Sequence, residues 1–127
     1  MDTGRILKGM QDSISHIQRD TGDLTIAQLS VLLLVMRRGR VTGMDICKAL
    51  DMSRPTTSRI VALLSDEETK NTRKHQEPLA LIRFDTEGDR ADPYRSQTET
   101  RDRRVKSVVL TEKGESLVRR IVESYSQ

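Results

Sequence analysis

Two short stretches of the chain gather side chains that bind anions. One reads SRPTTSR and carries hydroxyl or guanidinium groups at Ser53, Arg54, Thr56, Ser58 and Arg59. The other reads RDRR and consists of Arg101, Asp102, Arg103 and Arg104. Arginine binds phosphates and guanine edges through paired hydrogen bonds, and serine and threonine hydroxyls bond to phosphates or bases. These residue types predict recognition of a polyanion, with no covalent bond made or broken.

Common catalytic and metal-binding motifs do not occur in the sequence. It has no phosphate-binding glycine loop, no HExxH, no paired CxxC and no GxSxG. Because Cys47 is the one cysteine, an internal disulfide and a cysteine-based zinc site are excluded. We therefore expect no enzyme activity, no cofactor and no metal. Cys47 follows Ile46 on a predicted helix, so we expect a small buried side chain; the alternative is an exposed thiol that senses oxidation.

The charge of the chain is concentrated in one region. The whole sequence has a formal net charge of +3, whereas residues 37–60 alone hold six Lys or Arg against two Asp. Such a local excess favours a polyanionic partner. The N-terminus has no signal-peptide pattern, and the longest apolar run, residues 31–36, is too short to span a bilayer. We expect a soluble, cytoplasmic protein with no membrane partner.

The elements that position the basic residues are predicted to be helices. A helix over residues 25–38 begins at Thr25, with Gln28 completing a capping box, and ends at Gly39. It is apolar nearly all round, so we expect it at the centre of the core.

Two shorter helices joined by a tight turn come next, which is the pattern of a helix-turn-helix. Ser53 is a suitable N-cap for the second of them, and Pro55 falls in its first turn, where the missing N–H costs nothing. The predicted buried stripe of this helix consists of Thr57, Ile60, Val61 and Leu64. The alternative is an ordinary helical hairpin, but the basic and hydroxyl residues of its exposed side favour the helix-turn-helix.

The second half of the chain is predicted to form a hairpin and a helix. A polar insert at 65–78 precedes a strand at 79–85, and the partner strand lies at 103–110 after a long polar connection. Thr111 then caps a C-terminal helix over 111–127.

Both ends of the chain carry amphipathic helices that are candidates for pairing with a second copy. The N-terminal helix, within 4–22, has a narrow apolar stripe; its alternative role is to lie on its own domain. The expected dimerisation residues are Leu7, Met10, Ile14 and Ile17, together with Leu117, Ile121 and Tyr125.

Three stretches resemble the MarR family, the multiple-antibiotic-resistance regulators. Residues 24–50 resemble its core helix and the first helix of its motif, MSRPTTSRIVALL resembles its recognition helix, and RDRRVKSVVLTEKGESLV resembles its wing. The resemblance implies a mainly helical α+β fold. The implied fold is a single winged helix-turn-helix domain over residues 1–127, with a two-stranded wing and terminal helices available for dimerisation.

The resemblance also implies a function, that of a homodimeric transcription regulator of the repressor type on double-stranded DNA. Recognition helix 53–65 would enter the major groove and wing 79–110 would lie near the minor groove. Matched by motif, Asp102 would orient Arg104 in the wing, and the recognition contacts would fall on the SRPTTSR residues named above. No residue identifies a small-molecule effector.

Departures from the family pattern favour an alternative function. Family members usually pass from the recognition helix directly into a Gly-Leu-Ile/Val-x-Arg strand, whereas here the 14 residues of 65–78 come between. The connection at 86–104 is also long, with five arginines and five acidic residues. Such balanced insertions suit a protein surface. The alternative is therefore a winged-helix interaction module that acts on the transcription machinery and binds little DNA of its own.

Overall fold

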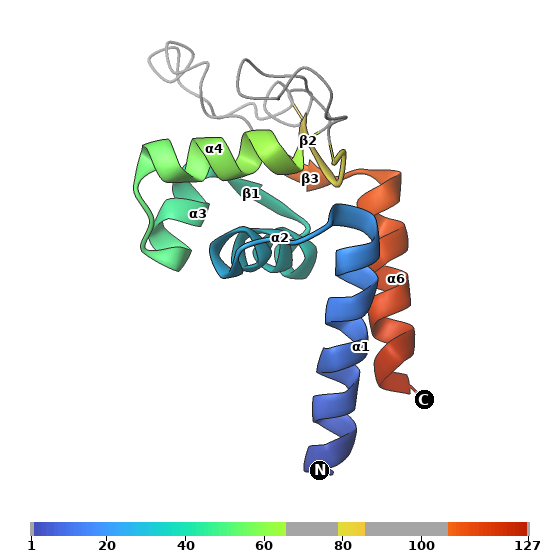
Figure 1. Cartoon of the computed structure of the whole chain (residues 1–127). Coiled ribbons are helices and arrows are strands. Elements are labelled where there is room, and N and C mark those ends of the chain that lie inside the picture. The colour runs from blue at the N-terminus through green and yellow to red at the C-terminus, as the bar shows by residue number, and fades with distance from the viewer. Residues whose placement is uncertain (1, 66–78, 86–106, 127) are drawn as a thin grey trace, which may run out of the picture.

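The computed structural model describes residues 2–65, 79–85 and 107–126. Figure 1 shows a block of helices and a small sheet, from which the terminal helices extend side by side as an arm, with both chain ends at its tip. The elements are α1 (Thr3–Thr21), α2 (Ile26–Arg38), β1 (Arg40–Thr42), α3 (Gly43–Leu50), α4 (Arg54–Leu64), β2 (Ile82–Asp85), β3 (Ser107–Leu110) and α6 (Glu112–Ser126).

Local signals in the sequence set the helix ends. The backbone N–H of Gln28 donates to Thr25 Oγ1 at 3.1 Å, and the backbone N–H of Thr25 donates to Gln28 Oε1 at 2.9 Å, which completes the capping box of α2. α2 ends at Gly39, whose φ of 80° suits glycine. Ser53 caps α4, and Pro55 lies in its first turn. These predicted helix ends are confirmed.

The described sheet has three antiparallel strands in the order β1-β3-β2. β2 and β3 belong to the predicted hairpin, with β2 beginning at Ile82, three residues later than expected. β1 was not predicted, because three residues are too few to show alternation. The wing predicted with two strands therefore has a third strand at its base. The predicted insert beyond Ser65 and the connection through residue 106 lie outside the described residues.

The core forms around α2, as its sequence predicted. Val31, Leu32 and Val35 are fully buried, but α2 is not buried all round, since Ile26 is 84% and Leu33 45% exposed. The predicted stripe of α4 faces the same core and consists of Thr57, Ile60, Val61 and Leu64. This packing fixes which side of α4 remains in solvent.

Apolar packing joins the arm to the block, and an ion pair joins the two helices of the arm, α1 and α6, to each other. Ile17 of α1 and Leu117 of α6 are buried in the core, and Ile121 packs against it. Ile17 and Leu117 are therefore core residues, which corrects their prediction as dimer contacts, and α1 lies on its own domain at this end. Ile121 is only partly buried, and its role as a dimer contact stays a prediction. The guanidinium of Arg120 donates to both carboxylate oxygens of Asp20, which links α6 to α1.

Candidate nucleic-acid interface

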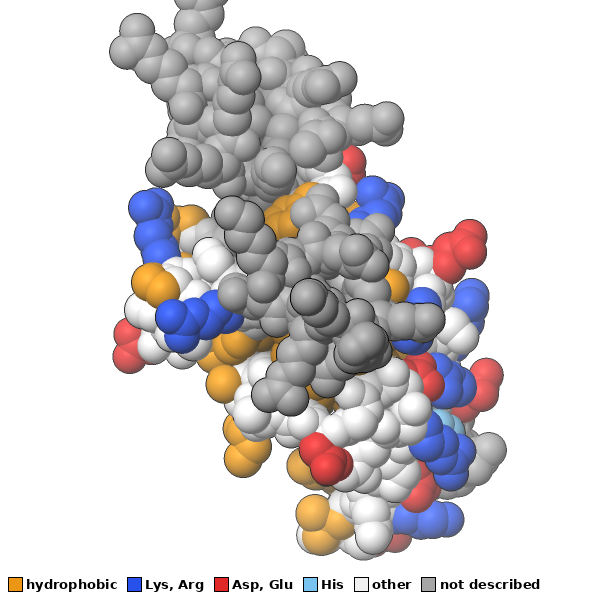
Figure 2. Space-filling model, turned by 45° about the horizontal axis from the view of Figure 1, so that its top comes forward, with side chains coloured by type: hydrophobic (Ala, Val, Ile, Leu, Met, Phe, Trp, Pro, Cys, Tyr) orange, Lys and Arg blue, Asp and Glu red, His pale blue; other side chains and the backbone are white. Residues whose placement is uncertain are grey.

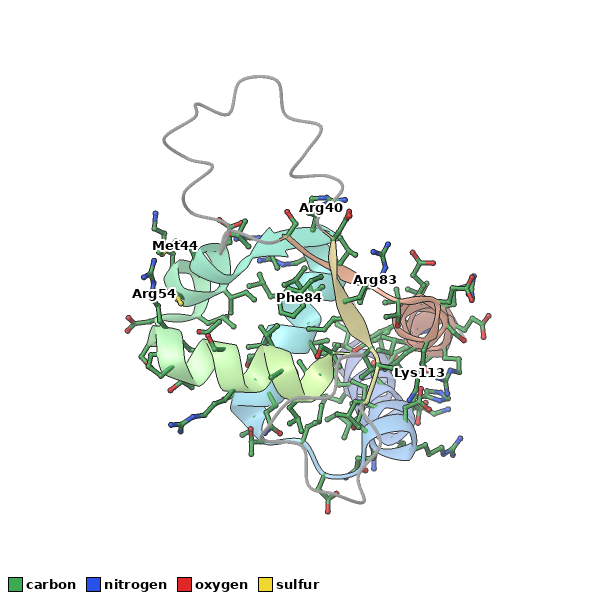
Figure 3. The ribbon with its side chains drawn as sticks, turned by 90° about the horizontal axis from the view of Figure 1, so that it is seen from above. Arg40, Met44, Arg54, Arg83, Phe84 and Lys113 are labelled. Carbon is green, nitrogen blue, oxygen red and sulfur yellow. The ribbon has the colours of Figure 1, made fainter. Side chains whose placement is uncertain are left out.

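The exposed side of α4 carries the predicted anion-binding residues. Because the stripe of α4 is buried, the five side chains that were singled out point to solvent, and all of them are exposed: Ser53, Arg54, Thr56, Ser58 and Arg59. Figure 3 shows Arg54 at the outer end of α4, beside Met44 of α3. The helix therefore presents two guanidinium groups and several hydroxyls on one rigid surface.

Two of these hydroxyls already form hydrogen bonds at the start of α4. Ser53 Oγ accepts from the backbone N–H of Thr56 at 3.3 Å and donates to Thr56 Oγ1 at 2.9 Å. Capping of this kind stabilises the first turn of a helix by about 1 kcal/mol. The groups best placed to contact a ligand are consequently Arg54, Ser58 and Arg59.

A hydrogen bond holds the two helices of the motif together. Cys47 Sγ of α3 donates to Thr57 Oγ1 of α4 at 3.3 Å, and Thr57 is only 3% exposed. Cys47 itself is partly buried. The prediction that Cys47 is buried is thus confirmed in part. Its thiol also has a polar partner, which the sequence did not reveal.

The N-terminus of α3 is fixed by a second capping box. Asp45 Oδ2 accepts from the backbone N–H of Thr42 at 2.9 Å, and Thr42 Oγ1 accepts from the backbone N–H of Asp45 at 3.1 Å. The hydrogen bond from the Thr42 backbone, helped by the Thr42 hydroxyl and the nearby Arg38 and Lys48, holds the pKa of Asp45 below its usual value despite some burial. The carboxylate is therefore ionised where it caps the helix.

Two arginines of the sheet were missed by sequence reasoning. Arg40 of β1 and Arg83 of β2 are both exposed, and both are in register with Val109 of the middle strand. Arg40 Nη2 donates to Asp85 Oδ2 across that strand. The alternation Arg83-Phe84-Asp85 was the available signal, since it places an arginine and an acid on the same side of a strand.

The predicted wing residues Arg101, Asp102, Arg103 and Arg104 lie outside the described residues. What the structure describes of the wing is its base, formed by β2 and β3 together with β1. The contribution of these four residues to an interface stays a prediction.

The arm has an apolar side and a polar side. Leu7, Met10 and Ile14 of α1 are 57%, 49% and 45% exposed, and Val122 and Tyr125 of α6 are exposed as well. A groove of about 360 Å³ lies between the same helices, lined by Asp12, Ser15, His16, Arg19, Arg120, Glu123 and Ser124. Figure 2 shows hydrophobic side chains along one side of the lower part of the molecule and charged ones along the other. The exposed apolar residues keep the prediction of a dimer contact open.

Over the described ranges, no group of three or more His, Cys, Asp or Glu side chains could hold a metal ion. No helix in the same ranges is both long and apolar enough to cross a membrane.

Known proteins were compared with this chain by family and by structure. The model of the MarR family matches residues 22–68, which contain α2, β1, α3 and α4. A search of curated proteins found no match.

Among solved structures, the chain is similar to BpsR of Bordetella bronchiseptica, whose DNA binding is regulated by 6-hydroxynicotinic acid. The two are 26% identical with a TM-score of 0.50, and the match covers 98% of this chain and 78% of that one. The similarity thus includes the arm as well as the matched helices.

Proposed function

We propose that this chain, a winged-helix protein of the MarR family, is a regulator of transcription that recognises a specific sequence in double-stranded DNA. The family consists of transcription regulators rather than enzymes. One observation carries the proposal: α4 is held by its buried stripe so that Arg54, Ser58 and Arg59 are all exposed on one helix. A helix fits the major groove of B-DNA, where arginine distinguishes guanine from other bases.

The role of each group on α4 follows from its chemistry. Arg59 and Ser58 lie beyond the first turn, and we assign them to base edges. Ser53 and Thr56 cap the helix, and Arg54 is the residue that follows the cap, so we assign these three to phosphates and to orientation of the helix. The wing arginines would add a minor-groove contact next to the site read by α4.

We further propose that the protein acts as a homodimer in the cytoplasm. The apolar side of the arm supports this, because Leu7, Met10 and Ile14 form an exposed row on successive turns of α1. Two identical readers related by a two-fold axis predict a pseudo-palindromic site. BpsR responds to a small carboxylic acid, but we assign no effector to this chain.

The experiment that tests this function is selection of bound sequences from random duplex DNA at moderate salt. Enrichment of a two-fold repeated motif would support it, with affinity that falls steeply as salt rises. Absence of any preferred duplex would contradict it. Capture of a stoichiometric protein partner that survives nuclease treatment would then favour the interaction module.

A further inference from the structure

The outer face of the sheet, turned away from the core, carries a second set of cationic side chains. Directly paired residues of antiparallel strands share a side of the sheet. Val41 and Phe84 pair with the buried Val108 and face the core. Arg40 and Arg83, each one residue removed from these, therefore lie together on the outer face.

The two arginines flank the same residue of the middle strand. Arg40 of β1 and Arg83 of β2 are both in register with Val109, which is only 9% exposed although it lies on this face. Aliphatic parts of arginine side chains cover neighbouring apolar groups while the charged ends stay in water. The pair thus presents two guanidinium groups from a three-stranded base rather than from a loop.

The surroundings of the two groups differ. One Nη of Arg40 is used by Asp85, which orients the guanidinium across β3 and leaves its remaining donors for a ligand. The guanidinium of Arg83 has no ion-pair or hydrogen-bond partner among the residues of 2–65, 79–85 and 107–126, although its backbone belongs to the β2–β3 ladder. Among the described residues of this face, one acid stands against two arginines, which gives them a net positive charge.

The position of the pair relative to α4 indicates its ligand. Figure 3 looks down on the molecule and shows Arg40 and Arg83 on the side of the sheet away from α4, while Arg54 lies at the opposite edge. A ligand on this side is therefore not read by α4 itself. Two exposed guanidinium groups on one face suit a polyanion, and the polyanion that this chain is proposed to bind is a DNA duplex, whose phosphates continue beyond the site read by α4. Arginine forks match the geometry of phosphate oxygens.

We propose that Arg40 and Arg83 bind phosphates of the DNA backbone outside the base pairs read by α4. This inference rests on the proposed function. The contact carries no sequence information, because phosphates are alike at every base pair. It makes affinity depend on how far the duplex continues past the recognised site.

The test compares two duplexes that contain the selected site. One stops at the ends of the site, and the other extends beyond it by about one helical turn, or about 10 base pairs, on each side. Arg40→Gln and Arg83→Gln remove the charge and retain much of the aliphatic stem. On the extended duplex, each should lower the slope of log affinity against log salt by about 0.9 per copy of the contact. The double variant should bind the extended duplex no more tightly than the short one. It should keep its preference for the selected sequence.

Arg119→Gln is the matched control, since Arg119 is an exposed arginine of α6 on the arm. It should leave the salt slope and the length dependence unchanged. If the double variant retains both as well, the inference is overturned. Loss of sequence preference together with a lower melting temperature also overturns it, because that result marks a structural role. If the wild type and the control bind no duplex at all, the proposed function itself fails.

Discussion

Arg59 illustrates how one side chain obtains its role from its neighbours. It is exposed because Thr57, Ile60 and Val61 around it turn into the core. A guanidinium beyond the first turn of a recognition helix is suited to a guanine edge, where a paired contact discriminates by about 1–3 kcal/mol. Arg54, directly after the N-cap Ser53, is suited to a phosphate.

Arg59→Ala should therefore reduce sequence discrimination more than overall attraction to DNA. We expect the ratio of affinities for selected and scrambled duplexes to fall by roughly 5-fold to 150-fold, which corresponds to the contact energy above. Competition binding at fixed salt measures this ratio. Arg54→Ala is the comparison: it should weaken both duplexes alike, and an equal loss of discrimination in both variants would contradict the assignment.

The backbone conformation of Ala80 costs free energy in the folded state. Its φ is 56°, and the segment cannot relax easily because its N–H donates to Ser65 O and its carbonyl accepts from Thr111 Oγ1 at 2.5 Å. A β-carbon in this left-handed region costs about 1–2 kcal/mol, part of which glycine returns through its freer unfolded state. Ala80→Gly should raise the free energy of unfolding by about 0.5 kcal/mol.

Denaturant titration measures that change, and Ala62→Gly serves as the control. Ala62 lies within α4, where glycine should destabilise by about 1 kcal/mol. Opposite signs are expected for the two substitutions. Destabilisation by both would show that the conformation of Ala80 carries no strain.

The elements of the fold meet most closely where α6 starts. A β-carbon on Gly114 would lie 2.2 Å from the carbonyl oxygen of Leu81. The same oxygen already accepts a hydrogen bond from the backbone N–H of Thr111 at 3.1 Å. The glycine thus lets the first turn of α6 approach the chain just before β2. Lys113 Nζ donates to Leu79 O at 2.8 Å and strengthens the same junction.

Gly114→Ala should accordingly lower the free energy of unfolding by about 1–3 kcal/mol, the cost of forcing atoms into a filled space. Gly43→Ala is the control, because nothing lies within 4 Å of a β-carbon there. Thermal or denaturant unfolding measures both. A Gly114→Ala variant as stable as the wild type would mean that the junction can open without cost.

The capping box of α3 predicts a dependence of stability on pH. Because the pKa of Asp45 is lower in the folded state than in the unfolded chain, its stabilisation is present above the unfolded pKa and is lost as pH falls through the folded one. At neutral pH, Asp45→Asn should cost about 0.5 kcal/mol. The difference from the wild type should vanish in acid, and a constant difference across pH would contradict the ionised cap.

At the scale of the whole molecule, one part of the arm belongs to the core and another part is exposed to solvent. Its inner residues Ile17 and Leu117 complete the core of the block, whereas Leu7, Met10 and Ile14 remain in solvent on α1. An exposed apolar row on a helix is typical of a surface that pairs. Pairing through the arm would set the spacing between two copies of α4.

Replacement of Met10 or Ile14 by Lys should convert the proposed dimer to a monomer, because an ammonium group would be buried in the apolar contact. Sedimentation or light scattering should then give the chain mass of 14.5 kDa instead of twice that value. Ser15→Lys on the polar groove is the control and should remain dimeric. A wild-type protein that is monomeric at micromolar concentration would refute the dimer.

Local chemistry by itself determined much of this protein. Thr25 with Gln28 and Ser53 with Pro55 specify helix starts through hydrogen bonds that span only a few residues, and they appear where predicted. The 3.6-residue repeat likewise placed the buried stripe of α4, and with it the exposed residues of the candidate interface.

Tertiary structure alone decided the rest, because it depends on contacts between distant segments. β1 exists only through pairing with β3, whose residues lie 65 to 69 positions later in the chain. Because β3 also pairs with β2, Arg40 and Arg83 flank Val109 on the two sides of β3. The packing of α1 on α6 determines that Ile17 is buried while Ile14 is exposed. A sequence pattern gives the apolar side of a helix, but only the packed fold determines which part of that side meets a neighbour.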